Sequence, residues 1–301
     1  MIDPKDFLKS LTDSDIRFFS GVPDSLLKEF CTTLETNKNI DHVIAANEGS
    51  AVAMAMGNYL SSKKVGCVYL QNSGLGNTIN PLVSLSDELV YRIPMLLIVG
   101  WRGEPGVKDE PQHIKQGMIT EEQLKLLDIS YEIIDSQSDF KKIIFNLTKA
   151  IHSEQKVGAL LIKKDSFSKL SSPSLPLKGL VLSREEAISS IVDLIPEKDL
   201  IISTTGKASR ELFEIRKLRQ QKNTDFLTVG GMGHTSSIAL GVALGNKNKQ
   251  VFCIDGDGSL IMHMGSMHTI SNQMPKNFTH IVLNNFAHDS VGGQPTYSQH
   301  L

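Results

Sequence analysis

The chain has 301 residues, of which 40% are hydrophobic and 21% charged, so it can bury a sizeable core and does not have the composition of a disordered protein. Its 31 basic and 33 acidic residues leave a formal charge of −2, which gives no reason to expect a nucleic-acid or membrane-surface partner. The apolar runs fall short of the ~20 residues that span a bilayer, no secretory signal is recognisable, and three cysteines without a Cys-x-x-Cys pair argue against a disulfide scaffold. We therefore expect a cytoplasmic enzyme.

Strand-like runs alternate with helical patterns along the first half of the chain. Strands are predicted at residues 17–20, 42–46, 65–71, 95–100 and 158–163. Helices are predicted at residues 24–33, 48–60, 78–86 and 121–152. A strand, a glycine-containing turn and a helix, repeated in this order, indicate a parallel sheet with crossover helices.

A Ser- and Pro-rich stretch then interrupts the pattern and predicts a linker at residues 166–182, between a first domain at 1–165 and a second at 183–301. The second half repeats the order of the first, with strands at 200–203, 226–229, 251–255 and 280–283. Because the first half continues to a fifth strand, the comparison predicts that the second domain lacks about 60 to 75 residues. We expect two doubly wound α/β domains with parallel sheets, the second one C-terminally incomplete.

The most specific chemical signal is the sequence Gly-Asp-Gly-Ser at residues 256–259, followed by Asn284 and Asn285. The first piece follows a predicted strand, where open α/β sheets bind ligands. Glycines let a diphosphate approach the backbone, and the start of the next helix offers unpaired N–H groups. Asp257 and Asn285 supply hard oxygens that suit Mg²⁺. Together the two pieces predict a site for Mg²⁺ and diphosphate, although either piece alone is compatible with an ordinary turn.

Glu48 is the second signal, because Ala and Gly surround it between an apolar strand and a helix of small residues. A carboxylate in such a place is poorly solvated, which raises its pKa and suits it to proton exchange near neutral pH. The alternative is a solvated glutamate that the helix dipole favours.

A glycine-rich turn at residues 231–233 allows two interpretations. With Asp255 ending the next strand, Gly231, Gly233 and Ser236 resemble the dinucleotide fingerprint of a nicotinamide-dependent oxidoreductase. However, the third position of the fingerprint is Ser rather than Gly or Ala. This alternative also leaves Glu48 and the pair Asn284 and Asn285 without a role.

Together these motifs resemble those of the thiamine-diphosphate-dependent decarboxylases and synthases. In that family a Glu at the place of Glu48 hydrogen-bonds N1′ of the aminopyrimidine, and a bulky apolar residue at the place of Met232 supports the bent cofactor. The metal ligands that the resemblance implies are Asp257, Asn285 and the backbone carbonyl of Ala287, which stands where the family often has Gly. The cofactor contacts that it implies are made by Glu48, Asn72, Thr205, Gly206, Met232, Gly233, Gly256, Gly258 and Ser259.

Four further segments, at residues 20–25, 72–77, 204–211 and 287–296, resemble the branch of this family that acts on phosphonopyruvate. The implied reaction is the decarboxylation of 3-phosphonopyruvate to phosphonoacetaldehyde and CO₂, with thiamine diphosphate and Mg²⁺, in phosphonate biosynthesis. Sulfopyruvate, or another 2-oxo acid, is the alternative substrate.

A substrate that carries a carboxylate and a phosphonate needs cationic or amide donors. The predicted substrate contacts are Asn77, Lys207 and Arg210. An imidazole titrates near the working pH, so His113 and His288 are predicted to transfer protons. With Glu48 they make up the predicted catalytic residues.

The resemblance also implies an assembly. In the family the cofactor lies between the pyrimidine-binding domain of one subunit and the diphosphate-binding domain of another. We therefore expect a homo-oligomer with its sites at subunit interfaces, acting on a small 2-oxo acid, with no nucleic-acid or membrane partner. Because the second domain looks incomplete, a non-catalytic cofactor-binding protein is an alternative of another class.

Overall fold

The structure is a computed structural model that describes residues 1–170 and 182–300. The chain divides into two units, Met1–Pro173 and Ser174–Leu301. Most of the predicted linker, residues 171–181, lies outside the described residues. The start of that predicted linker belongs to the first unit, because Phe167 is only 5% exposed and pairs with Ile2 in an isolated β-bridge. Among the described helices, none combines the length and the apolar character needed to cross a membrane.

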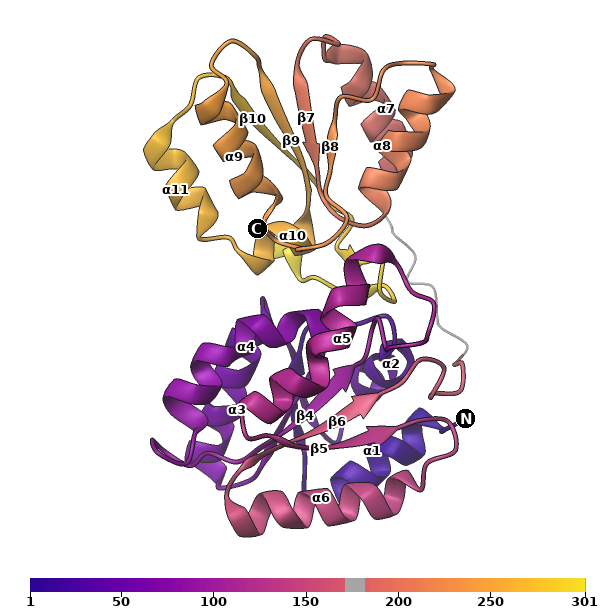
Figure 1. The fold of residues 1–301 in the computed structure, drawn as a ribbon, viewed down its shortest axis with the longest axis vertical. Coiled ribbons are helices and arrows are strands. Elements are labelled where there is room, and N and C mark those ends of the chain that lie inside the picture. Colours follow the sequence, from indigo (N-terminus) through magenta and orange to yellow (C-terminus); the bar gives the residue numbers. More distant parts are fainter. Residues whose placement is uncertain (171–181, 301) are drawn as a thin grey trace. The chain divides into compact units, whose positions relative to one another are not determined.

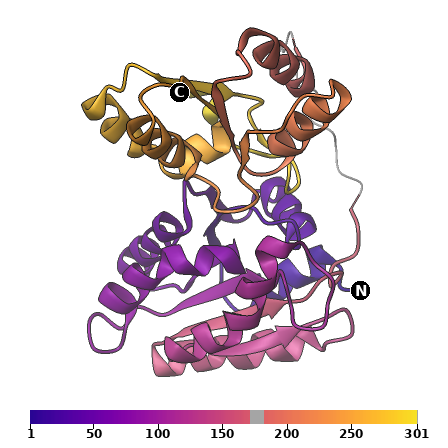
Figure 2. The same cartoon turned by 45° about the horizontal axis from the view of Figure 1, so that its top comes forward.

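The first unit is a six-stranded parallel sheet with helices on both faces (Figure 1, Figure 2). Its strands are β1 (Phe18–Gly21), β2 (Asp41–Ile44), β3 (Gly66–Gln71), β4 (Met95–Gly100), β5 (Ser130–Ile134) and β6 (Val157–Ile162), in the spatial order β2-β1-β3-β4-β6-β5. Its helices are α1 (Pro4–Asp13), α2 (Lys28–Thr36), α3 (Glu48–Ser62), α4 (Leu75–Pro81), α5 (Pro111–Leu126) and α6 (Phe140–Glu154). A 3-10 turn, η1 (Asn72–Gly74), precedes α4, and a π-helical segment, η2 (Leu82–Ser86), follows it.

Two apolar cores cover the two faces of this sheet. Residues of α1, α2 and α6 pack in one core, and residues of α3, α4 and α5 pack in the other. The central strand β4 is buried at every position, as expected for a parallel strand covered on both faces. Where β1 passes β3, a Cβ at Gly21 would lie 2.0 Å from the carbonyl oxygen of Tyr69, so only glycine fits there.

The prediction of one long helix at residues 121–152 is wrong. In the structure α5 ends at Leu126, the strand β5 follows, and α6 begins at Phe140. Among the described strands β5 is an outer one that pairs with β6 alone, and its first four residues alternate between exposed and partly buried positions before the buried Ile134. Five residues of this kind between two helical patterns are too short a run to interrupt the helical periodicity in sequence.

The second unit has a four-stranded parallel sheet, a two-stranded antiparallel hairpin and helices on both faces of the sheet (Figure 1). The strands of its sheet are β7 (Leu200–Ser203), β8 (Phe226–Leu227), β9 (Val251–Gly256) and β10 (Phe278–Leu283), and those of the hairpin are β11 (Ala287–His288) and β12 (Gln294–Pro295). Its helices are α7 (Arg184–Leu194), α8 (Lys207–Leu218), α9 (Thr235–Gly245), α10 (Asp257–Met262) and α11 (Ser266–Gln273), and a final 3-10 turn is η3 (Ser298–His300). Ser183 and Glu186 form a capping box at the start of α7, in which each side chain accepts a hydrogen bond from the backbone N–H of the other residue.

The internal repeat is confirmed by the strand order. The second sheet runs β8-β7-β9-β10, and the corresponding strands of the first sheet run β2-β1-β3-β4. In each unit the second strand is added on one side of the first strand, and the third and fourth strands are added on its other side. The order of the strands therefore switches between the first and third strands of the repeat. Ligands of open α/β sheets bind at the carboxyl ends of the strands beside such a switch point. The loops after β1 and β3, and those after β7 and β9, are therefore the places where each unit can bind a ligand.

Candidate active site

Glu48 is a buried carboxyl group of the first unit. It is the first residue of α3, directly after Asn47, whose side chain caps the helix by accepting a hydrogen bond from the Ser50 amide. Its side chain is 6% exposed, and its Oε2 accepts a hydrogen bond of 2.7 Å from Asn77 Nδ2. A Cβ at Gly74 would lie 2.4 Å from Oε1, so the carboxylate fits only because residue 74 is glycine. Burial raises the pKa of Glu48 above its ordinary value, and the Asn77 hydrogen bond opposes part of that rise.

The two asparagines that follow β3 have different partners. Asn77 holds Glu48, whereas Asn72 is fully buried and donates to the carbonyl oxygen of Arg102 and to Thr120 Oγ1. The side-chain oxygen of Asn72, Oδ1, in turn accepts a hydrogen bond from the Arg102 amide. Asn72 therefore fixes the loop after β4. Contacts of Asn72 with a cofactor and of Asn77 with a substrate stay predictions.

Arg102 and His113 lie on the loop and helix that follow β4. The Arg102 guanidinium makes a forked pair with Asp109, with Nε–Oδ2 at 2.8 Å and Nη2–Oδ1 at 2.5 Å, and its Nη1 donates to Ser25 Oγ. Arg102 lowers the pKa of Asp109, so this ion pair persists well into the acid range. Burial, and secondarily the charge of Arg102, lower the pKa of His113. His113 is thus a neutral imidazole at neutral pH, and its predicted catalytic role stays a prediction.

Asp257 is a buried carboxylate of the second unit, 3% exposed at the first position of α10. Its Oδ2 accepts hydrogen bonds from Thr296 Oγ1 at 2.5 Å and from Ser298 Oγ at 2.9 Å. Ser298 Oγ also lies 2.7 Å from Asn284 Oδ1. The sequence did not indicate these two hydroxyls as site residues, although residue 296 ends one of the motifs that carry the resemblance.

Asn285 lies in the loop after β10 and Ala287 begins β11, and the Ala287 amide donates to Asn285 Oδ1 at 3.2 Å. α10, which begins with Asp257, contacts both β10 and β11. The structure thus brings the three predicted metal ligands to neighbouring elements. Their coordination of a metal stays a prediction.

The predicted cofactor residues of the two glycine-rich loops are neighbours. The Gly233 amide donates to Ser259 Oγ at 3.1 Å, which ties the loop before α9 to the first turn of α10. A Cβ at Gly258 would lie 2.9 Å from His288 Cε1 and 3.3 Å from Met232 Cε. Met232, Gly258 and His288 therefore share one small region of the second unit. Burial lowers the pKa of His288, and the charge of Asp257 opposes part of that change.

The turn after β7 is built on Gly206, whose φ of 91° favours glycine. A Cβ there would also lie 2.7 Å from Ser290 Oγ. Lys207, the first residue of α8, donates to Asp289 Oδ2 at 2.8 Å. The sequence predicted that Lys207 meets an anion of the substrate, and the structure gives it an internal carboxylate partner. Arg210 is exposed on α8, and Thr205 is partly buried just before the turn.

The second unit fits a diphosphate and a divalent cation. In the part of the chain that the structure describes, the hydroxyls of Thr204 and Thr228 are buried without a hydrogen-bond partner, directly after β7 and β8. A buried hydroxyl without a partner is costly, and a diphosphate oxygen would satisfy it. Among the described side chains, those that donate hydrogen bonds to Asp257 donate to Oδ2. The other carboxylate oxygen, Oδ1, can therefore bind a cation. Hard oxygen donors of this kind suit Mg²⁺.

Comparisons with known proteins agree with this geometry. Residues 5–126 match the family described as "Thiamine pyrophosphate enzyme, N-terminal TPP binding domain", and residues 204–300 match its C-terminal TPP binding domain. A phosphonopyruvate decarboxylase of Streptomyces viridochromogenes is 35% identical, over 99% of this chain and 77% of the relative. A sulfopyruvate decarboxylase of Methanosarcina acetivorans is 28% identical, over 86% of this chain and 70% of the relative. The beta subunit of a sulfopyruvate decarboxylase of Methanocaldococcus jannaschii is 39% identical, over 38% of this chain and 58% of that subunit.

Proposed function

The chain belongs to the thiamine pyrophosphate enzymes, and from this premise we propose that it decarboxylates 3-phosphonopyruvate to phosphonoacetaldehyde and CO₂, with thiamine diphosphate and Mg²⁺ as cofactors. The observation that carries the proposal is Glu48, a buried carboxyl with a raised pKa that Asn77 and Gly74 hold in one position. A group of this kind can hold or release a proton near neutral pH. The location we propose is the cytoplasm.

The residues of the second unit would hold the diphosphate end of the cofactor. Asp257, Asn285 and the Ala287 carbonyl would bind Mg²⁺. The diphosphate contacts would come from Thr205, Gly206, Gly256, Gly258 and Ser259. Met232 and Gly233 would lie against the organic part of the cofactor, beside His288. When bound, thiamine diphosphate supplies an electron sink for the electrons released as CO₂ leaves.

Glu48 would act on the aminopyrimidine of the cofactor by holding a proton against a ring nitrogen. Burial keeps the carboxyl protonated to a higher pH than a solvated glutamate, which is the state that can donate this hydrogen bond. Asn77 fixes Oε2 of Glu48 by donating a hydrogen bond to it, so the other carboxyl oxygen, Oε1, would face the ligand. His113 and His288 would move protons at the substrate, because burial keeps both rings neutral.

The substrate preference follows from the relatives and from charge. Both named relatives that span most of this chain act on a 2-oxo acid with a second, strongly acidic group. Lys207 and Arg210, on the first turn of α8, would meet that group, and a phosphonate offers them a higher negative charge than a sulfonate. The higher identity to the phosphonopyruvate enzyme favours phosphonate, and sulfopyruvate is the alternative.

A homo-oligomer with shared sites would complete the enzyme. The segment that follows β3 in the first unit exposes a set of large apolar side chains, which a subunit contact would cover. They are Ile79, Val83, Leu85, Leu89, Val90 and Tyr91. One relative is by name a subunit of a larger enzyme, which supports an assembly of several chains.

The dinucleotide alternative has little support. The family matches cover both halves of the chain. Asp255, the acid of that fingerprint, is buried and already accepts hydrogen bonds from the Gly256 amide and from His280. The hydroxyl of Ser236, at the third position of the fingerprint, is hydrogen-bonded to the hydroxyl of Ser266.

A substrate series tests the proposal. Purified protein with thiamine diphosphate and Mg²⁺ is given 3-phosphonopyruvate, 3-sulfopyruvate or pyruvate, and CO₂ release is measured. We expect the highest kcat/KM with 3-phosphonopyruvate. A higher value with 3-sulfopyruvate would replace the substrate but keep the reaction. Cofactor binding without CO₂ from any of the three acids would instead support a non-catalytic cofactor-binding protein.

A further inference from the structure

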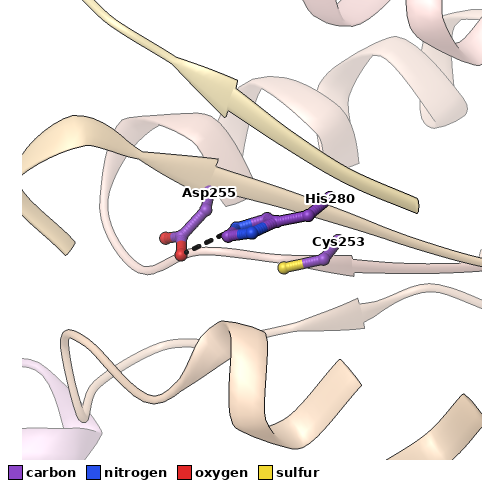
Figure 3. A group of neighbouring side chains, drawn as sticks. All are labelled: Cys253, Asp255 and His280. Atoms are coloured by element: carbon purple, nitrogen blue, oxygen red, sulfur yellow. Dashed lines mark hydrogen bonds and ion pairs between the residues drawn. The ribbon is translucent and has the colours of Figure 1, made fainter. Parts of the chain in front are cut away.

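Three side chains with metal-binding atoms converge on one face of the second sheet (Figure 3). Cys253 and Asp255 lie two residues apart on β9, so both point to the same face of the strand. His280 lies on the neighbouring strand β10, directly opposite Cys253 in the register. Figure 3 shows the thiol, the carboxylate and the imidazole turned toward one another. Among the described residues, no other group of three such side chains brings its ligand atoms together in this way.

The geometry of the three atoms is close to that of a metal centre. The candidate ligand atoms of Cys253, Asp255 and His280 all lie within 4.8 Å of one another. His280 Nε2 is 3.3 Å from Asp255 Oδ2. Two ligand atoms that each lie about 2.0–2.2 Å from a tetrahedral ion are separated by about this distance. The Cys253 sulfur lies within 4.8 Å of both of these atoms.

Charge explains why an ion would be stable there. Cys253 and Asp255 are 0% and 1% exposed, so both groups are removed from water. A buried carboxylate is costly unless a positive charge accompanies it. A divalent cation bound by one thiolate, one carboxylate and one neutral imidazole has no net charge, so the complete centre can be buried without an uncompensated charge.

We propose that Cys253, Asp255 and His280 bind one zinc ion, in a centre separate from the Mg²⁺ site at Asp257. Binding forms bonds from the ion to Sγ, Oδ2 and Nε2, and the proton of the Cys253 thiol passes to solvent. The fourth position is taken by water or is left open. The donor set selects the metal, because thiolate and imidazole suit zinc, whereas Mg²⁺ requires oxygen ligands.

The proposed zinc centre and the proposed Mg²⁺ site use residues of different elements. The zinc ligands lie within β9 and β10, while Asp257 begins α10 and is bonded to Thr296 and Ser298. Asp255 also accepts a hydrogen bond from the amide of Gly256, the last residue of β9 and the first of the Gly-Asp-Gly-Ser sequence. A zinc ion bound there would thus link the end of β9, at Asp255, to the middle of β10, at His280. The centre is structural in this respect, and its binding test does not depend on the proposed reaction.

Cobalt provides the test, because Co²⁺ replaces zinc and a thiolate bound to it absorbs in the near ultraviolet. The full-length protein is freed of metal with a chelator and titrated with Co²⁺ in the presence of excess Mg²⁺, which saturates the oxygen site. We expect a thiolate–cobalt absorption band that saturates at one ion per chain and disappears when Zn²⁺ is added. In Cys253→Ala the band should be absent, because alanine lacks the sulfur and fits the surrounding apolar cluster.

Cys67→Ala is the matched control, because Cys67 is equally buried and free but lies in the first unit. It should keep the band. His280→Asn should weaken Co²⁺ binding by at least about tenfold, as the loss of even an outer-sphere partner does, and it replaces the cysteine variant if that one does not fold. No band in the unaltered protein would overturn the proposal. A band that survives in Cys253→Ala, or that is lost in a folded Cys67→Ala, would do so as well.

Discussion

Glu48 combines two properties that are seldom found in one carboxyl group, burial and a single fixed position. Asn77 holds one oxygen, and the missing side chain of Gly74 leaves room for the other. The cost of this arrangement is that the ionised form is poorly solvated, so the pKa rises. A carboxyl that destabilises the free protein in its charged form is typical of a site that is built for chemistry rather than for stability.

The raised pKa of Glu48 makes stability depend on pH in a defined direction. Below its ordinary value of 4.5, Glu48 is protonated in both the folded and the unfolded chain. As the pH rises above that value, the unfolded chain releases the proton while the folded chain retains it, so the free energy of unfolding falls until folded Glu48 ionises. Glu48→Gln removes this loss. We expect the cofactor-free variant to melt higher than the unaltered protein at pH 8, by about 2–4 °C, and equally at pH 4.

Thermal denaturation at the two pH values measures this difference. Glu122→Gln is the control, because Glu122 is exposed on α5 and should leave the melting temperature unchanged at both pH values. A Glu48→Gln variant that melts at or below the unaltered protein at pH 8 would contradict the interpretation of Glu48 as an unfavourably buried acid.

Lys207 has two possible partners, the internal carboxylate of Asp289 and the acidic group of the substrate. If the substrate takes the ammonium group, Lys207→Met should raise the KM for 3-phosphonopyruvate about tenfold with little change in kcat, because one charge-assisted contact is lost. Steady-state kinetics decides this, with Lys217→Met at the far end of the same helix as the control. An unchanged KM would show that Lys207 serves only its ion pair with Asp289.

Among the elements, the hairpin of β11 and β12 folds back to the start of α10. It places His288 against Gly258, and the residues that follow it place two hydroxyls on the Asp257 carboxylate. Hydrogen bonds to a metal-binding carboxylate orient it and tune its affinity. The hairpin thus supports the carboxylate of Asp257, the predicted Mg²⁺ ligand.

Removing one of these hydroxyls should weaken the metal site. We expect Thr296→Val to raise the Kd for Mg²⁺ about tenfold in calorimetric titrations with thiamine diphosphate present, because an oriented carboxylate loses one of its partners. Thr279→Val, at an exposed position of β10, provides the comparison and should leave the Kd unchanged. Equal Mg²⁺ affinity in both variants would mean that Thr296 has no part in holding Asp257.

The elements also show how far the sequence could be interpreted. The strands and their repeat were predictable because apolar runs end in glycine-rich turns, and the parallel order followed from the alternation with helices. β5 was missed because its five residues continue the polarity pattern of the helices around it. The roles of Thr296 and Ser298 were missed because their partner lies about forty positions earlier in the chain, and only the folded hairpin brings them there. The pairing of Lys207 with Asp289, 82 positions apart, was missed for the same reason.

For the whole molecule, the central expectation is that Glu48 and Asp257 serve one site while belonging to different subunits. Mixing two inactive variants tests this. Glu48→Gln and Asp257→Asn, unfolded and refolded together or exchanged as subunits, should form hybrid dimers in which one of the two sites is intact. About half of the dimers in a random mixture are hybrids, so the mixture should regain about a quarter of full activity. The same two variants, mixed without subunit exchange, should stay inactive. Hybrids that never regain activity would place both residues of each site in one chain.

Cofactor-dependent release of CO₂ from 3-phosphonopyruvate is the measurement that tests the account most directly. The unaltered protein, Glu48→Gln and the control Glu122→Gln are compared with thiamine diphosphate and Mg²⁺ present, and again with either cofactor omitted. We expect release only with both cofactors, no loss in Glu122→Gln, and a fall of at least about 100-fold in Glu48→Gln. Release that continues without thiamine diphosphate, or that is unchanged in Glu48→Gln, would contradict the account.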